Sequence, residues 1–599
     1  MKKRVADIVV ETLIENGITD AFSVVGGGAM HLNNAFAIKK DKLKTVYNHH
    51  EQACAMAAEA YSRLTGKIAA VCVTSGPGGL NTYNGVQGAY VDSLPMIVIA
   101  GHPRYNTTVE YSGLDVRCIG VQENDCITQV RNMTKYAKLV IDPKNVKQEI
   151  QYAIDVAMDG RRGPVWISIP LDVQGALIEE YELLPVKEFK SQVPEIKHDD
   201  LEYMYEKMCR AKRPVILTGS GIRTGNAFEN FHKFLEFFDV PIVGGWGASD
   251  VNYCGEKNYY GMSGSICPRA GNFILQNSDF ILVLGNSLSS TQTGFNVEAF
   301  APNAEIIMVD AQKDESKKPG LHINKLIHAD LNAFFIACIE YGKKIATDPE
   351  WKTYCNMLKD ELPNYEVLNQ LPKGDGSELV HPTQFWKEFF NKAEKNSIIA
   401  LGNSSCIGGA LQEGVKFSGQ RIIVNYHSGS MGIDLPFAIG AAQAVPGNSV
   451  YCVTGDGCLM MNLQELQTIK YNKYRIKIVI FNNSGYDNIR MTCRNYFNGV
   501  GNGCDSSSGI SMPDFGKIAE AFEFDYKKVS CVSELSEGID WYLKNDDACI
   551  LEIIEKQDKE RAPVIKSVMD ENGQFVTPPL HVMSPLLNED LMKKYSKYI

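Results

Sequence analysis

Two side chains with oxygen ligands, Asp456 and Asn483, occupy similar positions in the chain. Asp456 lies within Gly455-Asp456-Gly457, and Asn483 closes the pair Asn482-Asn483. A carboxylate and an amide oxygen are hard ligands that suit Mg²⁺, which usually also binds water and substrate phosphates. The flanking glycines let the backbone approach a ligand, and a helix beginning after Gly457 favours an anion at its N-terminus. The sequence therefore predicts a diphosphate bridged by Mg²⁺.

The neighbouring segments predict how this pair is positioned. Apolar runs at residues 450–453 and 476–481 precede the two motifs, and residues 459–471 between them have a helical pattern. A right-handed strand–helix–strand crossover places the carboxyl ends of both strands at one edge of a parallel sheet. We therefore expect Asp456 and Asn483 to meet at that edge.

The Gly-Asp-Gly tripeptide alone is weak evidence, because the chain contains it twice. Gly374-Asp375-Gly376 lies in a polar stretch with no strand pattern before it, and we interpret that copy as a linker turn. A turn aspartate is also the simplest interpretation of Asp456 taken singly. The strands and helix around Asp456 are what distinguish the two copies.

Length and composition bound the class of protein. A chain of 599 residues is too long for a single core, and its 44% hydrophobic and 22% charged residues are ordinary for a globular protein. The net charge of −11 argues against a nucleic-acid partner. The 16 scattered cysteines and the missing secretory or membrane segment predict a cytoplasmic protein without a membrane partner.

Alternating helix and strand patterns predict an α/β fold with three doubly wound parallel-sheet domains. We place these domains at residues 1–184, 200–345 and 378–556, followed by a tail at 557–599. The polar stretches at 185–200 and 347–381 are expected to be linkers, the second with Pro349, Pro363 and Pro372.

From about residue 5 to about residue 556, the chain resembles the thiamine diphosphate (ThDP) enzymes, and most of all their acetolactate synthase and pyruvate oxidase branch. Besides the two motifs above, the resemblance rests on Asn48-His49-His50-Glu51-Gln52-Ala53, Thr74-Ser75-Gly76-Pro77-Gly78-Gly79, Gly163-Pro164-Val165-Trp166 and Gly429-Ser430-Met431-Gly432. It implies a pyrimidine-binding domain, a central domain and a diphosphate-binding domain in that order.

The resemblance implies catalytic roles for three residues of the first domain. Glu51 matches the glutamate that bonds the cofactor's aminopyrimidine, which requires a carboxyl group able to hold a proton at neutral pH and hence a buried, apolar setting. His50 matches the family's His-Glu pair, and Gln122 matches an active-site glutamine. A structural hydrogen-bonding role for His50 and Gln122 stays open.

Further residues of the chain match the family's cofactor and metal sites. Met431 matches the side chain that bends the cofactor, and Gly429 the carbonyl that faces its amino group. Metal ligation falls to Asp456, Asn483 and the Gly485 carbonyl. The remaining matches to the cofactor site are Gly26, Gly402, Asn403, Ser404, Gly455, Gly457 and Asn482. Because Glu51 faces a cofactor held by the other subunit in this family, the resemblance implies a homodimer or homotetramer.

Two departures from acetolactate synthases concern the acceptor. Thr492 stands where they have a tryptophan, and Ser287 and Thr291 stand where they have arginines. A carboxylate acceptor favours a fixed guanidinium fork, so the loss argues against a second 2-keto acid. It also puts FAD in doubt.

We therefore predict a ThDP- and Mg²⁺-dependent carboligase or lyase. It would decarboxylate a 2-keto acid such as pyruvate and pass the acyl anion to an aldehyde or ketone, for which we suggest a keto-sugar. The alternatives are acetolactate synthase proper, a ThDP-dependent decarboxylase or C–C hydrolase, and an inactive paralogue acting as a binding subunit. We also hypothesise that the 557–599 tail closes over the active site.

Overall fold

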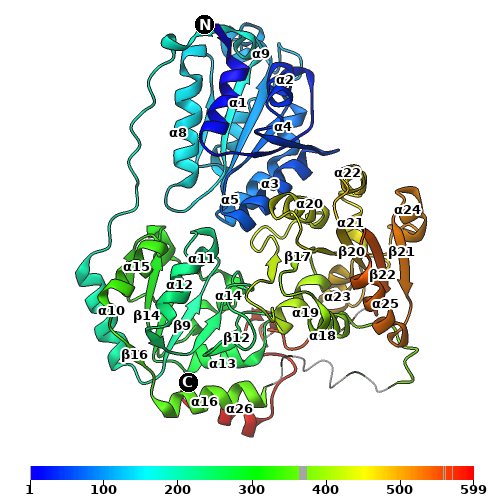
Figure 1. Ribbon diagram of the computed structural model, residues 1–599. Coiled ribbons are helices and arrows are strands. Elements are labelled where there is room, and N and C mark those ends of the chain that lie inside the picture. The colour runs from blue at the N-terminus through cyan, green and yellow to red at the C-terminus, as the bar shows by residue number, and fades with distance from the viewer. Residues whose placement is uncertain are drawn as a thin grey trace.

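The computed structural model describes residues 2–362, 364, 371, 374–557, 559, 561–569 and 571–599. It contains three six-stranded sheets, each flanked by helices, and every strand pair within them is parallel (Figure 1). The α/β fold class with three parallel-sheet domains is thus confirmed. Among the described helices, none combines the length and apolarity needed to cross a membrane.

The first sheet has both faces buried, as an all-parallel sheet requires. Val71 and Val73 pack into one core, whereas Ala70 and Cys72 on the same strand pack into another. In spatial order its strands are β3 (Lys44–Tyr47), β2 (Asp20–Ser23), β4 (Ala69–Val73), β5 (Met96–His102), β7 (Val165–Pro170) and β6 (Tyr136–Leu139). Its main helices are α1 (Val5–Glu15), α3 (Glu51–Thr65), α5 (Tyr83–Val91) and α8 (Val146–Met158).

The third sheet has the same strand order as the first, 2-1-3-4-6-5 counted along each domain. Its strands in spatial order are β18 (Arg421–Ile423), β17 (Ile398–Leu401), β19 (Val450–Gly455), β20 (Ile476–Asn482), β22 (Cys549–Ile554) and β21 (Asp525–Val529). The helix expected over residues 459–471 is two helices, α21 (Asp456–Leu459) and α22 (Glu465–Asn472). At the break, Asn462 Nδ2 donates to Gly432 O at 2.7 Å.

The middle sheet follows a different order, 3-2-1-4-5-6. It comprises β12 (Tyr259–Met262), β11 (Ile242–Gly244), β9 (Pro214–Thr218), β13 (Phe280–Leu284), β14 (Glu305–Asp310) and β15 (Lys325–His328). The C-terminal helix α26 (Glu589–Tyr595) also lies on this domain (Figure 1), where Tyr595 joins its core.

The linker expected over residues 347–381 is wrong in its first part. Helix α16 (Pro349–Glu361) begins there, and Trp351, Tyr354 and Leu358 form its buried face against the middle sheet. Pro349 starts this helix instead of breaking it, because the first turn needs no N–H donor from that position. Pro363 and Pro372 lie outside the described residues.

The first and third domains are joined by matching carboxylates. Asp92, just after α5, accepts hydrogen bonds from the backbone N–H groups of Tyr426 and His427 at 3.0 and 3.2 Å. In return, Glu465 of α22 accepts from the N–H groups of His49 and His50 at 3.0 and 3.2 Å. Each carboxylate thus fixes the loop that leads into the packed helices α3 and α20 (Asp434–Ala444).

A buried arginine neutralises this interface. Arg63 Nη2 lies 2.9 Å from Glu59 Oε1 and 2.6 Å from Asp92 Oδ2, and all three side chains are almost fully buried. Burial raises the pKa of Asp92, but Arg63 and His427 outweigh this effect and hold that pKa at about 2. The charge on Asp92 therefore depends on Arg63.

We expect Arg63→Met to reduce the free energy of unfolding by about 3–5 kcal/mol, because it leaves buried carboxylates without their cation. Urea denaturation followed by circular dichroism measures the change. Arg210→Met is the control: its ion pair with Glu206 is exposed, and its loss should cost less than about 1 kcal/mol. Equal costs for the two variants would contradict the role of Arg63.

Candidate active site

Asp456 stands at the carboxyl edge of the third sheet, between the ends of β19 and β20. Its Oδ2 accepts hydrogen bonds from the backbone N–H groups of Asn483 at 3.1 Å and Gly485 at 3.0 Å. Its Oδ1 accepts from Gly457 N at 2.7 Å. Burial raises the pKa of Asp456 to about 6, against the effect of these bonds. Asp456 and Asn483 therefore meet at the sheet edge, as strand order requires.

Two glycines allow this close approach. A Cβ at Gly457 would lie 2.2 Å from the ring of Tyr486, and a Cβ at Gly485 would lie 2.0 Å from the carbonyl oxygen of Cys504. Gly485 also has a φ of +151°, a conformation that other residues rarely adopt. The loop that follows β20 consequently depends on glycine at both positions.

A cavity of about 500 Å³ opens at this edge, within the usual range for ligand sites. Its walls include Asp456, Asn483 and Gly485, together with Gly429, Met431, Asn403, Ser404, Gly455 and Gly457. Residues predicted from separate motifs thus surround one space. Its described lining comes entirely from the third domain.

The polar groups of this edge fit a hard divalent cation. The Asp456 carboxylate, the Asn483 amide oxygen and the Gly485 carbonyl are oxygen donors in neighbouring positions. In this structure Asn483 Oδ1 accepts a hydrogen bond from Arg490 Nη2 at 2.6 Å. A cation on Asn483 would require Arg490 to release that oxygen while keeping its ion pair with Asp487, at 3.2 Å.

The other predicted cofactor residues differ in their surroundings. The Gly429 carbonyl accepts a hydrogen bond from Asn403 Nδ2. Gly402 lies against Asp434, since a Cβ there would meet Asp434 Oδ2 at 2.7 Å. Asn482 does not line the cavity, because its Nδ2 donates to Glu552 Oε1 at 2.5 Å and its Oδ1 accepts from Ser484 N.

The predicted residues of the first domain gather at the carboxyl edge of the first sheet, around the loop after β4. Glu51 is the first residue of α3, and its Oε2 accepts a hydrogen bond from Asn81 Nδ2 at 2.9 Å. A Cβ at Gly76 would lie 2.3 Å from the Gln122 carbonyl oxygen, and one at Gly26 would lie 2.5 Å from Thr74. Glu51 is half-buried in the single chain, so within one subunit it lacks the fully buried setting expected of it.

His50 has a clear structural role. It is the N-cap of α3, and its Nδ1 accepts a hydrogen bond from Gln52 N at 3.1 Å. Gln122 is exposed and has a φ of +57°. Neither residue lines the cavity beside Asp456.

Three family models match the chain in the order of its sheets. They are the thiamine pyrophosphate enzyme N-terminal TPP binding domain over residues 3–122, the central domain over 201–334, and the C-terminal TPP binding domain over 404–553. The chain belongs to the thiamine pyrophosphate enzyme family. Thiamine diphosphate is therefore its cofactor, and it is an enzyme of the ThDP-dependent transferase or lyase type.

Curated relatives place this ThDP enzyme in the acetolactate synthase branch. It is 27% identical over 552 residues to the acetolactate synthase isozyme 2 large subunit of Escherichia coli, covering 92% of this chain and 95% of the relative. It is 28% identical to acetolactate synthase 1, chloroplastic, of Nicotiana tabacum, with 94% and 83% covered. The acetolactate synthase large subunit of Buchnera aphidicola is also 28% identical, with 90% and 92% covered.

Sequence reasoning missed a buried charge cluster beside the Asp456 cavity. Lys559 Nζ lies 2.7 Å from Glu555 Oε1 and 3.2 Å from Asp487 Oδ2, and all three side chains are nearly inaccessible. Asn483 Nδ2 also donates to Glu555 Oε1, at 2.6 Å. The position of Glu555 just after β22 was the one available signal, because ligands bind beyond strand carboxyl ends.

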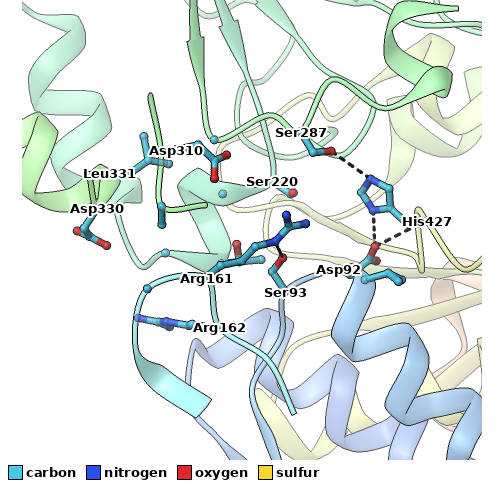
Figure 2. Close-up of a pocket in the computed structure, with 17 residues that line it drawn as sticks. Asp92, Ser93, Arg161, Arg162, Ser220, Ser287, Asp310, Asp330, Leu331 and His427 are labelled. Atoms are coloured by element: carbon cyan, nitrogen blue, oxygen red, sulfur yellow. Dashed lines mark hydrogen bonds and ion pairs between the residues drawn. The ribbon is translucent and has the colours of Figure 1, made fainter. Parts of the chain in front are cut away.

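A second polar site lies between the first and middle domains, where the family's acceptor and flavin arginines would be expected. Figure 2 shows His427 between Asp92 and Ser287: its Nδ1 lies 2.6 Å from Asp92 Oδ1, and its Nε2 lies 3.5 Å from Ser287 Oγ. Arg161 donates to Ser93 Oγ at 2.7 Å and pairs with Glu315. Polar side chains therefore bond to one another between the domains at this site.

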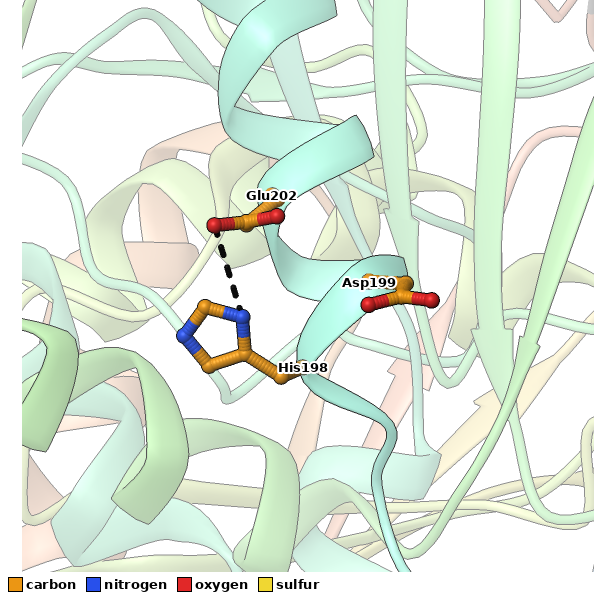
Figure 3. A group of neighbouring side chains, drawn as sticks. All are labelled: His198, Asp199 and Glu202. Carbon is orange, nitrogen blue, oxygen red and sulfur yellow. Dashed lines mark ion pairs between the residues drawn. The ribbon is translucent and has the colours of Figure 1, made fainter.

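Another group of possible metal ligands lies away from these sites. His198, Asp199 and Glu202 are exposed on the first turns of α10 (His198–Arg210), and His198 pairs with Glu202 at 3.4 Å (Figure 3). An exposed pair one helical turn apart is ordinary surface structure, and we assign it no ligand.

Because the chain contains Gly-Asp-Gly twice, the second copy provides a matched control for a test of Asp456 as a metal ligand. We expect Asp456→Asn to weaken Mg²⁺-dependent ThDP binding by about 100-fold or more, since even outer-shell changes cost 10–100-fold at metal sites. Asp375→Asn makes the same substitution in the exposed second copy and should leave binding unchanged. Isothermal titration with ThDP and Mg²⁺ measures both. Normal binding by Asp456→Asn would show that this edge is not the metal site.

Proposed function

We propose that the enzyme is a Mg²⁺-dependent carboligase or lyase that decarboxylates a 2-keto acid, with pyruvate as the first candidate. The observation that carries this proposal is the cavity in which Asp456, Asn483 and Gly485 meet Met431 and Gly429. When bound, ThDP supplies a nucleophilic carbon that attacks a carbonyl group and holds negative charge after decarboxylation. The chain's own residues must bind it, bend it and move its protons.

The proposed roles follow from the residue types. Asp456, Asn483 and the Gly485 carbonyl would hold Mg²⁺, while Asn403 and Ser404 would contact the diphosphate. Met431 would set the bend, and the Gly429 carbonyl would accept a hydrogen bond from the cofactor's amino group once Asn403 releases it. Glu51 would hold a proton against the aminopyrimidine ring.

We infer that the complete site requires a second copy of the chain. The Asp456 cavity has no described lining from the first domain, so Glu51 does not reach it from the same subunit. Exposed apolar side chains border both half-sites: Val25, Leu80, Ile119 and Val121 near Glu51, and Met460, Met461 and Ile489 beside the cavity. An isologous homodimer, alone or paired as a tetramer, would cover these surfaces and bury Glu51.

The acceptor is proposed to be an aldehyde or ketone without a carboxylate, such as a keto-sugar. Ser287 faces His427, and Thr291 Oγ1 bonds to Ser289 Oγ at 2.8 Å within its own turn. Thr492 Oγ1 donates back to Asn488 O at 3.0 Å. The nearby Arg161 is already paired with Glu315. No guanidinium is thus held ready for a second keto acid at positions 287, 291 or 492.

The same positions support the proposal that the middle domain does not use FAD. His427 crosses to Ser287 where an arginine would border the flavin in relatives that bind one. We expect the purified protein to show no flavin absorbance near 450 nm, and a stoichiometric flavin spectrum would contradict the proposal.

Acetolactate synthase proper is the second candidate, and the names of the curated relatives favour it. The two candidates differ in product. With ThDP and Mg²⁺ present, we expect pyruvate to be consumed slowly, and faster once an aldehyde or keto-sugar is added. NMR identifies the products. Acetolactate formed as efficiently as any other product would contradict the proposed acceptor.

Glu51→Gln tests the proton role within the same assay. We expect turnover to fall by about 10²–10⁴-fold, the usual contribution of a positioned acid or base, while ThDP still binds. Glu180→Gln, a change in a surface turn of the same domain, is the control and should retain wild-type turnover. Undiminished turnover by Glu51→Gln would exclude the role.

A further inference from the structure

The C-terminal tail places a cation in contact with two residues that line the Asp456 cavity. Arg561 Nη2 donates to Ser404 Oγ at 3.0 Å and to Asn488 Oδ1. Ser404 and Asn488 both line the cavity beside Asp456. The guanidinium of Arg561 therefore connects the loop after β17 with the first turn of α23 (Asp487–Tyr496), from a segment remote in sequence from both.

The contacts of Arg561 leave its charge available. Its two described hydrogen-bond acceptors are neutral oxygens, and its Nη1 and Nε make no hydrogen bond to a described residue. The nearest carboxylates, Asp487 and Glu555, already contact Lys559. Burial lowers the pKa of Arg561 despite these carboxylates, but a guanidinium stays charged in proteins. A half-buried cation that contacts only neutral groups favours an anionic ligand.

The tail that carries Arg561 is anchored on two domains. Before it, Gln557 Nε2 donates to Asn483 O at 2.8 Å, at the metal edge itself. After it, Ala562 O accepts from Gln412 Nε2 at 3.2 Å, and Ile565 N donates to Ser265 O of the middle domain at 2.9 Å. Both ends of the segment are therefore held, and Arg561 is positioned by the fold.

We propose that Arg561 binds the diphosphate of the cofactor, so that the tail supplies a cation to the ThDP site. The inference rests on the proposed function, which places the diphosphate beside Ser404 and Asp456. A diphosphate ester carries more negative charge than its contacts with neutral loop groups balance, and a guanidinium binds phosphate oxygens through paired N–H groups. The carboxylate of the 2-keto acid is the rival anion for the same cation.

Isothermal titration of Arg561→Gln with ThDP at fixed Mg²⁺ tests the proposal without turnover. We expect ThDP affinity to fall about tenfold or more, because hydrogen bonds between charged groups are among the strong ones. Inorganic pyrophosphate, which lacks the thiazolium and pyrimidine rings, should lose its power to displace ThDP in the same variant. Arg561→Lys should restore part of the affinity.

Lys566→Gln is the matched control. It removes one positive charge from an exposed position in the same tail, so ThDP affinity should stay at the wild-type value. Melting temperatures of apo variants equal to that of the wild type would show that the tail remains docked. In Arg561→Gln, a loss of ThDP affinity without a change in that temperature would support direct binding.

Two results would overturn the proposal. One is unchanged ThDP affinity in Arg561→Gln with a raised KM for the 2-keto acid at saturating ThDP, which would assign the guanidinium to the donor carboxylate. The other is no change in either quantity, which would leave Arg561 a structural link. A wild-type protein that binds no ThDP would instead refute the proposed function, and this inference with it.

Discussion

The carboxylate of Asp456 is the interaction on which the third domain's edge depends. It accepts three backbone N–H groups, from Gly457, Asn483 and Gly485, and so holds the ends of two neighbouring strands in one arrangement. Satisfying buried N–H groups in this way fixes the loops. The same arrangement brings Asn483 and Gly485 into the lining of one cavity, which is why one side chain can organise a proposed metal and diphosphate site.

The relation between the first and third domains supports the proposal that each holds only half of the site. Their sheets share one strand order, and a carboxylate of each domain, Asp92 or Glu465, fixes the loop that leads into the other's packed helix. This internal pairing occupies the α3 and α20 faces of one chain. Glu51 and the Asp456 cavity remain at separate carboxyl edges, bordered by exposed apolar side chains. This separation supports the proposal that a second copy of the chain covers both edges.

Much of this could be predicted from sequence where local pattern and topology agree. The strand–helix–strand pattern alone placed Asp456 beside Asn483, because two neighbouring parallel strands end at the same edge of their sheet. Sequence patterns predicted less where contacts between residues distant in the chain determine the structure. Pro349 was taken for a linker residue although it opens α16, whose Trp351 is buried by the middle sheet. Asn482 was grouped with Asn483, but alternation along the strand end turns it toward Glu552.

The contacts of the 557–599 tail could not be predicted from sequence patterns either. Its hypothesised closure over the active site stays a prediction. At its beginning, the tail bonds to three residues of the cavity lining: Gln557 to Asn483, Lys559 to Glu555 and Arg561 to Ser404. Farther along the tail, Phe575 packs near Tyr496 of the third domain, and Tyr595 packs near Phe273 of the middle domain. No spacing in the sequence connects Arg561 to Ser404 or Lys559 to Asp487, since these contacts arise only from the docking of separate domains.

Subunit complementation is the most direct test of a site divided between two chains. Glu51→Gln and Asp456→Asn subunits, each inactive alone, would be unfolded together, refolded as a mixture and assayed. A divided site predicts that each mixed dimer has one intact site and one doubly altered site. Random pairing would then restore about a quarter of wild-type turnover, because half of the dimers are mixed. No recovery in verified mixed dimers would contradict the account and place Glu51 and Asp456 in the same site of a single chain.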